Sequence, residues 1–357
     1  MSALARGDGR RSPGPHGVGV VGVGYWGPNV VRVFASLSNC TLVRACDSRP
    51  GRLEYVRQQV PQVEICHDYR DLLDDPRLDA ICIVTPMETH YDLALQALSA
   101  GRHVLVEKPL ATSVAQARRL VDEAERRGLV LAAGHLFVYH PAIERLHAEL
   151  EAGTFGRLCT MQSERINLGP PGAVHDVVWD LAVHDIAIAL YLADEPPLEV
   201  VAYAGCYVHP TLHDAALVVV RYGGAPGQTL FSQHHVSWLS PHRVRRFFAV
   251  GTSGAGLFDG TREPRALTLF GRGYDTRLHA PANGAIELKY GGGEGQTPEL
   301  PAVEPLRAEC AHFLECVETG RPPRADGRAG LRVVQVLEAA HRSLASGSSP
   351  VALEPLF

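Results

Sequence analysis

The sequence lacks long apolar runs, a strong net charge and closely spaced cysteine pairs. No hydrophobic stretch approaches the ~20 residues that a membrane-spanning helix needs, so no transmembrane segment is predicted. The net charge of −5 gives no broad electrostatic attraction to nucleic acid or to an anionic membrane. The eight cysteines include no C-x-x-C pair, and this pattern favours a reduced, cytoplasmic protein over a disulfide-stabilised one.

Histidine is plentiful, with 17 in the chain, but its spacing does not predict a metal site. His209 and His213 are four residues apart, yet Pro210 between them opposes a helix that would present both on one face. His234 and His235 are adjacent in a strand-like run and are expected to point to opposite faces. We therefore expect neither a structural nor a catalytic metal ion.

The first sixteen residues are polar and rich in glycine, proline and arginine. They contain no apolar segment of the kind that a secretory signal needs, so a disordered tail is expected at 1–16. The remaining length is enough for two full-sized domains. We place a dinucleotide-binding domain at 17–140 and a domain for substrate binding and oligomerisation at 141–357.

The strongest signal is a glycine-rich turn, V-V-G-V-G-Y-W-G, at residues 20–27. It follows an apolar strand-like run and precedes a helix-like run, and Pro28 suits the first helical turn because an N–H there would lack a partner anyway. Glycines at 22, 24 and 27 allow a tight turn, close approach of the backbone to a pyrophosphate, and close packing of helix on strand. The N–H groups at the start of the helix would hold the phosphates. The motif therefore predicts dinucleotide binding.

Up to about residue 140, apolar strands alternate with helical patterns. The expected strands are 17–21, 41–46, 80–84, 103–106 and 130–133, and the expected helices are 28–37, 51–59, 91–100 and 114–127. Such alternation is typical of a doubly wound parallel sheet with helices on both faces, an α/β Rossmann domain. Because ligands bind at the carboxyl ends of such strands, we expect the cofactor site there.

From about residue 155 the pattern changes. Alternating polar and apolar runs, joined by turns rich in glycine, proline and histidine, predict an open and mostly antiparallel sheet in an α+β domain. The expected strands are 158–166, 198–208, 215–222, 229–238 and 244–250. One strong helix is expected at 176–192. Two final helices, at 305–318 and 327–344, are candidates to pack back on the first domain.

Asp47 ends the second strand, twenty residues after Gly27. A carboxylate there can accept hydrogen bonds from both adenine-ribose hydroxyls and would repel a 2′-phosphate, which favours NAD over NADP. Arg49, two residues on, leaves NADP open because it could meet that phosphate. A solvated aspartate that opens the turn D-S-R-P-G is the alternative interpretation.

Lys108 follows an apolar strand in V-E-K-P-L, and Pro109 fixes the turn after it. A lysine beside a hydride-transfer site can polarise a substrate oxygen and shift the pKa of a neighbouring acid or base. A lysine at a strand end is by itself more often simply exposed, but the other motifs favour the catalytic interpretation. The cofactor contacts are expected from the glycine-rich turn and the strand ends: Gly22, Gly24, Tyr25, Trp26, Gly27, Asp47, Arg49, Thr85, Pro86, His90, Glu107 and Lys108.

The segment W-D-L-A-V-H-D-I places Asp180 and His184 four residues apart on a nearly apolar helix. Both side chains then lie on one face, where two ionisable groups must be paired or must face a polar cavity. A carboxylate and an imidazole aimed at one place suit proton transfer with a substrate hydroxyl. A capping aspartate beside a structural histidine is the alternative. Asp185 should point elsewhere.

In their order along the chain, these motifs resemble those of the Gfo/Idh/MocA oxidoreductases, and the resemblance runs from about residue 17 to 344. It implies a Rossmann domain followed by an open, largely antiparallel sheet, whose outer face often mediates assembly into a homodimer or homotetramer. The family's catalytic lysine falls on Lys108, and its D-x-x-x-H pair falls on Asp180 and His184. The substrate contacts are expected from His135, Arg165, Asn167, Asp180 and His184.

The resemblance also implies a sugar, cyclitol or nucleotide-sugar substrate held between the sheet and the nicotinamide. The segments R-I-N-L-G and V-S-W-L-S-P-H-R-V-R-R look like those of members in bacterial surface-polysaccharide and aminosugar pathways, which often act at C3 of a nucleotide-linked sugar. Two residues depart from that subgroup. Val183 replaces an expected proline and should straighten the helix locally, and His140 replaces an expected asparagine and would place an imidazole near the cofactor's edge.

We therefore expect an NAD(P)-dependent oxidoreductase that transfers a hydride between nicotinamide and a secondary hydroxyl or ketone of a sugar. The main substrate class is a nucleotide-linked sugar or aminosugar precursor, and an inositol or free-sugar dehydrogenase is the alternative. A non-catalytic dinucleotide-binding sensor, and a hydro-lyase or glycosidase that oxidises its substrate transiently, are alternatives from other classes. The presence of all three acid–base positions favours the enzyme over the sensor.

Overall fold

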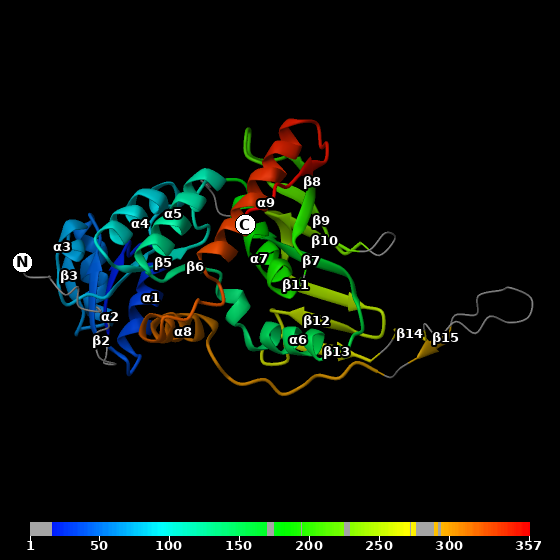
Figure 1. Ribbon diagram of the computed structural model, residues 1–357, viewed down its shortest axis with the longest axis horizontal. Coiled ribbons are helices and arrows are strands. Elements are labelled where there is room, and N and C mark those ends of the chain that lie inside the picture. The colour runs from blue at the N-terminus through cyan, green and yellow to red at the C-terminus, as the bar shows by residue number, and fades with distance from the viewer. Residues whose placement is uncertain are drawn as a thin grey trace, which may run out of the picture.

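Two β-sheets organise the chain, one in its first part and one in its second (Figure 1). The computed structural model describes residues 16–169, 175–193, 195–224, 229–271, 273–275, 289–291 and 294–357. Nearly all of the tail expected at 1–16 lies outside these described residues. The arrangement confirms the predicted α/β Rossmann domain followed by a second domain built on an open sheet.

The first sheet is parallel throughout, with the strand order β3-β2-β1-β4-β5-β6. Its strands are β1 (His16–Val21), β2 (Cys40–Cys46), β3 (Glu64–Cys66), β4 (Ala80–Ile83), β5 (His103–Glu107) and β6 (Leu131–Gly134). The strand order reverses between β1 and β4, and doubly wound sheets bind their ligands at such a switch point. The sequence patterns predicted all of these strands except β3, which has only three residues.

Helices pack on both faces of this sheet (Figure 1). They are α1 (Gly27–Ala35), α2 (Pro50–Gln59), α3 (Arg70–Leu73), α4 (His90–Ser99) and α5 (Val114–Arg127). The best-defined helix is α5, because the Ser113 side chain caps its first turn and Gly128 ends it in the left-handed conformation, with φ of 65°. These end signals explain why both of its predicted ends agree with the structure.

The second sheet has the order β13-β12-β11-β7-β10-β9-β8-β16. Its strands are β7 (Leu158–Leu168), β8 (Pro197–Gly205), β9 (Ala215–Tyr222), β10 (Phe231–Ser237), β11 (Leu239–Gly251), β12 (Ala255–Asp259), β13 (Leu267–Phe270) and β16 (Val351–Ala352). The pairing of β10 with β7 is parallel, and the other pairs are antiparallel. The sheet is therefore mixed and mostly antiparallel, as predicted. A separate ribbon pairs β14 (Gly273–Asp275) with β15 (Lys289–Gly291).

Helices cover one face of the second sheet, and in the described part of the chain no helix covers the other, open face. The covering elements are the short helices η2 (Leu136–Tyr139) and η3 (Val178–Ala182) and the helices α6 (Pro141–Glu151), α7 (Val183–Leu192) and α9 (Gly327–Ala345). Along β9 and β10, buried residues alternate with less buried ones. This alternation is what a sheet with one covered face requires.

The C-terminal helices return to the first part of the chain (Figure 1). Helix α8 (Pro305–Thr319) packs on α1, where Phe313 joins the core around Phe34. Helix α9 joins both cores, because Leu331 packs with the first sheet while Val336 packs with the second. None of the helices in the described part of the chain is long and apolar enough to cross a membrane.

Candidate active site

In the glycine-rich turn between β1 and α1, two glycines are required by packing and a third leaves room for a ligand. Gly22 has φ of +91°, and a Cβ there would lie 2.7 Å from the backbone of Val84. A Cβ on Gly27 would lie 2.2 Å from the Gly22 carbonyl oxygen. A Cβ on Gly24 would instead approach the flexible side chain of Arg52, at 2.9 Å. The turn thus fits a pyrophosphate that approaches the backbone at Gly24.

The start of α1 is also suited to bind a pyrophosphate. No side chain caps the helix, and Pro28 occupies its first turn. The first N–H groups of a helix lack intrahelical partners and carry the positive end of its dipole. The helix can therefore hold the phosphates of a dinucleotide, as the motif predicted.

Asp47 directly follows β2 and is 7% exposed. Its Oδ2 accepts a hydrogen bond from the Val23 N–H at 3.0 Å, and its Oδ1 accepts one from the Arg49 N–H at 2.9 Å. These bonds hold the carboxylate beside the glycine-rich turn, where an adenine ribose would lie. The Arg49 side chain is exposed, whereas Arg52 Nη1 lies 3.8 Å from Asp47 Oδ2. Sequence reasoning named Arg49 and missed Arg52, which belongs to no motif.

His90, proposed from the sequence as a cofactor contact, is 1% exposed. Its Nδ1 lies 2.8 Å from the Pro109 carbonyl oxygen and its Nε2 lies 2.9 Å from that of Thr85. His90 therefore links the segments that follow β4 and β5. His90 thereby positions Thr85, whose hydroxyl is hydrogen-bonded to that of Thr89 at 2.6 Å. Pro86, in the same turn, is exposed.

The other candidates around the cofactor differ widely in exposure. Tyr25 is 96% exposed, so its ring is available to a ligand. Trp26 packs against the core beneath α1. Burial raises the pKa of Glu107, while Lys108 and a hydrogen bond from Trp26 oppose this shift. Glu107 Oε2 also accepts a hydrogen bond from the Lys108 backbone N–H at 3.0 Å, so Glu107 shapes the turn that presents Lys108.

Lys108 and Asp180, predicted to share one site, are in direct contact. Lys108 Nζ donates to the Asp180 carbonyl oxygen at 3.0 Å and lies 3.3 Å from Asp180 Oδ1. Asp180 Oδ2 accepts a hydrogen bond from Trp238 Nε1 at 3.2 Å. The three residues come from the end of β5, from η3 and from the junction of β10 with β11. The segment V-S-W-L-S-P-H-R-V-R-R stands out in the sequence, but nothing in it assigns a role to Trp238.

The helix that carries Asp180 and His184 is not regular. The sequence predicted one α-helix at 176–192, but residues 178–182 form the π turn η3. Val183, expected to straighten the helix, begins the α-helical part directly after it. A π turn inserts an extra residue and is frequent at functional sites. It sets the angle between the side chains of Asp180 and His184 in a way that the four-residue spacing does not show.

His184 and His135 are buried imidazoles with unpartnered ring nitrogens. Within the described chain, His184 Nδ1 and both ring nitrogens of His135 are buried without a hydrogen-bond partner. Burial lowers the pKa of His184 well below its usual value, and the charges of Lys108 and Arg165 lower it further. Burial and then Lys108 lower the pKa of His135 to about 4. Both rings are therefore neutral at pH 7, and His184 packs edge-on against Phe137 with ring centroids 5.2 Å apart.

Arg165 and Asn167, proposed as substrate contacts, both lie on β7. Arg165 is buried and donates to the Asp185 carboxylate, with Nη2 at 2.6 Å from Oδ1. Asp185 thus points toward Arg165. Asn167 Oδ1 accepts a hydrogen bond from Arg245, and burial followed by Arg165 lowers the pKa of Arg245 to about 10. Lys108, Arg165 and Arg245 therefore give the site a cationic lining.

His140, expected at the cofactor's edge, is held through both of its ring nitrogens. Its Nδ1 accepts a hydrogen bond from the Ala142 N–H at 3.1 Å and so caps α6. Its Nε2 lies 2.8 Å from Glu263 Oε1. Both ring nitrogens are engaged, because the helix begins at Pro141 and its first N–H groups need acceptors.

A groove of about 1320 Å³ lies elsewhere, along the amino ends of β1, β5 and β6. His16, His103 and Leu131 mark those strand starts among its lining residues. The glycine-rich turn, Asp47 and Lys108 all follow the carboxyl ends of strands, where α/β sheets bind their ligands. We therefore take the carboxyl edge, and not this groove, as the candidate active site.

Comparison with known proteins agrees with this geometry. Residues 16–135 match the model of an oxidoreductase family with an NAD-binding Rossmann fold, and residues 143–256 match the GFO/IDH/MocA C-terminal domain. The chain is 30% identical over 322 residues to UDP-N-acetylglucosamine 3-dehydrogenase of Acidithiobacillus ferrooxidans, covering 88% of this chain and 93% of that protein.

Two further matches cover most of the chain. It is 26% identical over 328 residues to scyllo-inositol 2-dehydrogenase (NAD(+)) of Bacillus subtilis, with 86% of each chain covered. A solved structure of the Acidithiobacillus enzyme superposes with a TM-score of 0.77 at 25% identity, over 94% of this chain and 99% of that one. The glycine-rich turn, the strand-end lysine and these matches lead to one conclusion: the chain belongs to the Gfo/Idh/MocA oxidoreductases, whose first domain is an NAD-binding Rossmann fold.

Proposed function

We propose that the protein is an NAD-dependent dehydrogenase that acts on a secondary hydroxyl or ketone of a nucleotide-linked sugar or aminosugar precursor. The contact between Lys108 Nζ and Asp180 carries this proposal, because it fixes an ammonium at the end of β5, on the same carboxyl edge of the sheet as the turn that fits a dinucleotide. A lysine that was simply exposed to solvent would not make these two contacts, whereas the Lys108 side chain makes both and is only 22% exposed.

The chain's own residues can perform the proton chemistry. Bound NAD would supply the hydride acceptor. An ammonium has three N–H donors, and the described contacts of Lys108 Nζ are with Asp180, which leaves donor capacity for a substrate oxygen. In the direction of oxidation, neutral His184 would take the hydroxyl proton while Lys108 stabilises the negative charge that develops on the same oxygen. Asp180 would hold the lysine in position.

The cationic lining supports an anionic substrate. Arg165 is committed to Asp185, but the nearby guanidinium of Arg245 and the exposed Arg243 add positive charge on the same side of β11. Arg246 instead pairs with Asp259 at 3.0 Å. A diphosphate is the group that such cations bind well, and a relative is named for a UDP-sugar. An inositol substrate is the second candidate, because another relative is a scyllo-inositol dehydrogenase.

Saturation-transfer NMR on the NAD-loaded protein separates the two substrate classes. We expect signals from the sugar and nucleotide protons of UDP- or dTDP-sugars, together with reduction of NAD when the right sugar is present. Signals and NAD reduction with free inositols, and none with nucleotide-sugars, would replace the main proposal by the second.

We also propose that the chain divides into two domains near residue 140. Residues 17–140 would bind the cofactor, and residues 141–357 would bind the substrate and form the contacts of the assembly. The match to the first family model ends at residue 135 and the match to the second begins at residue 143, on either side of this boundary.

We infer a homodimer or homotetramer that forms through the open face of the second sheet, where Tyr203 is 56% and Phe231 is 40% exposed. We place the protein in the cytoplasm, because none of its eight cysteines forms a disulfide.

A further inference from the structure

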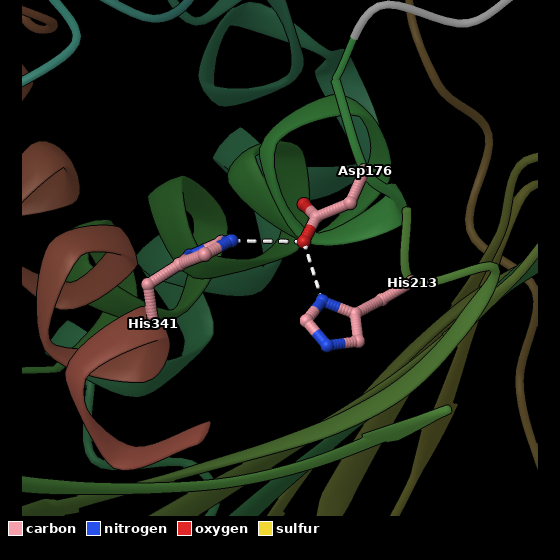
Figure 2. Close-up of side chains that lie close together, drawn as sticks. All are labelled: Asp176, His213 and His341. Atoms are coloured by element: carbon pink, nitrogen blue, oxygen red, sulfur yellow. Dashed lines mark hydrogen bonds and ion pairs between the residues drawn. The ribbon is translucent and has the colours of Figure 1, made fainter. Parts of the chain in front are cut away.

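Asp176, His213 and His341 gather outside the candidate active site (Figure 2). Asp176 precedes η3, His213 lies between β8 and β9, and His341 is on α9. One ligand atom from each lies within 4.8 Å of the other two. The Asp176 side chain is 5% exposed, while the rings of His213 and His341 are 29% and 33% exposed. The cluster therefore has a buried carboxylate and a side that solvent can reach.

The two carboxylate oxygens of Asp176 have different tasks. Oδ1 accepts hydrogen bonds from the backbone N–H groups of Val178 and Trp179 at 3.2 and 3.3 Å. Oδ2 faces two imidazole nitrogens, His213 Nδ1 and His341 Nε2, each at 2.8 Å (Figure 2). The helix start thus fixes the orientation of the carboxylate, and its second oxygen is presented to both rings.

The hydrogen bonds of His341 limit what can lie between its ring and the Asp176 carboxylate. His341 Nδ1 lies 3.2 Å from the carbonyl oxygen of Leu337, one helical turn earlier. A carbonyl oxygen can only accept, so Nδ1 carries a hydrogen. In a neutral ring Nε2 is then an acceptor, and its lone pair faces Asp176 Oδ2, which is also an acceptor. The contact is stable when a proton on Nε2 or a metal ion lies between the two atoms, so the atoms that can share a proton here can also bind a cation.

We propose that Asp176, His213 and His341 bind one divalent metal ion of the zinc class per chain. Two imidazole nitrogens and one carboxylate oxygen form a donor set that zinc favours over calcium or magnesium. A ligand histidine usually donates its other ring N–H to a carbonyl or carboxylate, as His341 does to Leu337. Zinc–ligand bonds of about 2.1 Å need only a modest opening of the cluster, which its partly exposed rings can provide.

The ion would hold the start of the helix that carries the candidate catalytic pair. The Asp176 carbonyl oxygen accepts a hydrogen bond from the Asp180 N–H at 3.1 Å, and Asp180 holds Lys108. His341 brings α9 to the same point, although it lies 165 residues from Asp176 in sequence. This separation, and the 37 residues between Asp176 and His213, explain why short-range spacing predicted no metal. The proposal concerns binding and stability and does not depend on the substrate.

Equilibrium dialysis of the full chain against low-micromolar zinc, followed by metal analysis, tests the proposal. We expect one zinc ion per chain in the wild type and a loss of affinity of at least about tenfold in both H341Q and D176N, because changing a ligand should cost no less than the roughly 10–100-fold loss caused by changing a residue that only orients a ligand. Asparagine caps a helix as well as aspartate does, so D176N keeps the role of Oδ1. Cobalt, used as a spectroscopic probe, should show visible absorption bands in the wild type that both variants lose.

The matched control is H235Q, which replaces a half-exposed histidine that lies 3.5 Å from Glu164 on the second sheet. This variant should bind zinc like the wild type, and zinc should raise the Tm of both. Circular dichroism in metal-free buffer checks the fold of each variant, and H213Q supplies the test if another variant fails to fold. Absence of bound zinc in the wild type, or zinc retained by H341Q and H213Q, would overturn the proposal.

Discussion

Lys108 donates a hydrogen bond to the backbone carbonyl oxygen of Asp180 across 3.0 Å. This contact joins the end of a strand in the Rossmann sheet to the π turn that begins the main helix of the second domain. Because the acceptor is a backbone atom, the position of the ammonium depends on the path of the main chain as well as on the Asp180 carboxylate. In the proposed site, the contact between Lys108 and the π turn would therefore determine where a substrate oxygen is held.

The first prediction concerns Lys108 and His184. Lys108→Met and His184→Asn remove the ionisable groups and keep approximate size. Each should lower kcat by about 10²–10⁴, the usual contribution of acid–base groups, and should change the Kd of NAD little, because the lost interactions strengthen in the transition state. Steady-state kinetics and a fluorescence titration with NAD measure the two effects.

The double variant is the control for joint action of these residues. If Lys108 and His184 act on one oxygen, the combined loss should be much smaller than the product of the single losses, because residues that work as a unit are not additive. Near-normal kcat in either single variant, with NAD bound and the fold intact, would contradict the proposed site.

Trp238 gives a second prediction about the same site. Trp238→Phe keeps an aromatic ring but removes the N–H that donates to Asp180 Oδ2 at 3.2 Å. A hydrogen bond to a charged group contributes about 1.5–3 kcal/mol, and part of it orients the carboxylate that contacts Lys108. We expect kcat to fall roughly three- to tenfold, with the Kd of NAD unchanged. An unaltered kcat would show that Asp180 does not need the indole to position Lys108.

The sequence was sufficient for the parts of the fold that have local signals. The glycine-rich turn predicted β1 and α1, and the helical pattern at 114–127 predicted α5, whose ends Ser113 and Gly128 define in the structure. Lys108 also stands out because the chain has only two lysines among its 34 lysine and arginine residues. Local patterns failed where a residue's partner is distant in sequence.

Two such cases belong to the site. Trp238 contacts Asp180 from 58 residues away, and Arg165 pairs with Asp185 across 20 residues. The motifs that contain these residues do not show either pairing, because each pairing results from packing of β7 and β10 against the main helix. The π turn was missed because hydrophobic periodicity cannot distinguish it from α-helix over a single turn. These contacts determine how the side chains of the candidate site are placed, whereas the motifs show only which chemical groups the site contains.

The third prediction concerns cofactor choice. Asp47→Ser should weaken NAD binding by about 1–3 kcal/mol, the scale of lost hydrogen bonds to a charged group, and should relieve the repulsion of a 2′-phosphate. Arg52 lies 3.8 Å from Asp47 Oδ2, so the Asp47→Ser variant should gain affinity for NADP through this guanidinium. Adding Arg52→Gln should abolish that gain. Titrations of both cofactors measure the effects, and a wild type that prefers NADP would refute this interpretation of Asp47.

The fourth prediction concerns assembly. The open face of the second sheet, with Tyr203 and Phe231 exposed, should be covered by the same face of another subunit. Light scattering at micromolar concentration should give the mass of a dimer or tetramer. Tyr203→Glu and Phe231→Glu, which place like charges on the face, should shift that mass toward the monomer. A wild-type monomer would contradict the proposal.

The fifth prediction concerns pH and His135, whose pKa burial lowers to about 4. The unfolded chain takes up a proton at this residue near its ordinary pKa of about 6.5, so the unfolded state binds more protons than the folded state between these two values. The free energy of unfolding should therefore fall as the pH drops from 6.5 toward 4. His135 alone should account for a loss of about 2 kcal/mol between pH 7 and pH 5.

His135→Leu isolates this contribution, because leucine fills a buried site without titrating. Urea denaturation at pH 7 and pH 5 should show a loss of stability in His135→Leu that is smaller than in the wild type by about 2 kcal/mol. The contribution of buried His184 is common to both proteins and cancels in the comparison. The exposed-histidine control His235→Gln should lose as much stability as the wild type does. An equal loss in His135→Leu and the wild type would mean that the His135 ring accepts a proton in the folded state, and that its surroundings are more polar than its unpartnered nitrogens indicate.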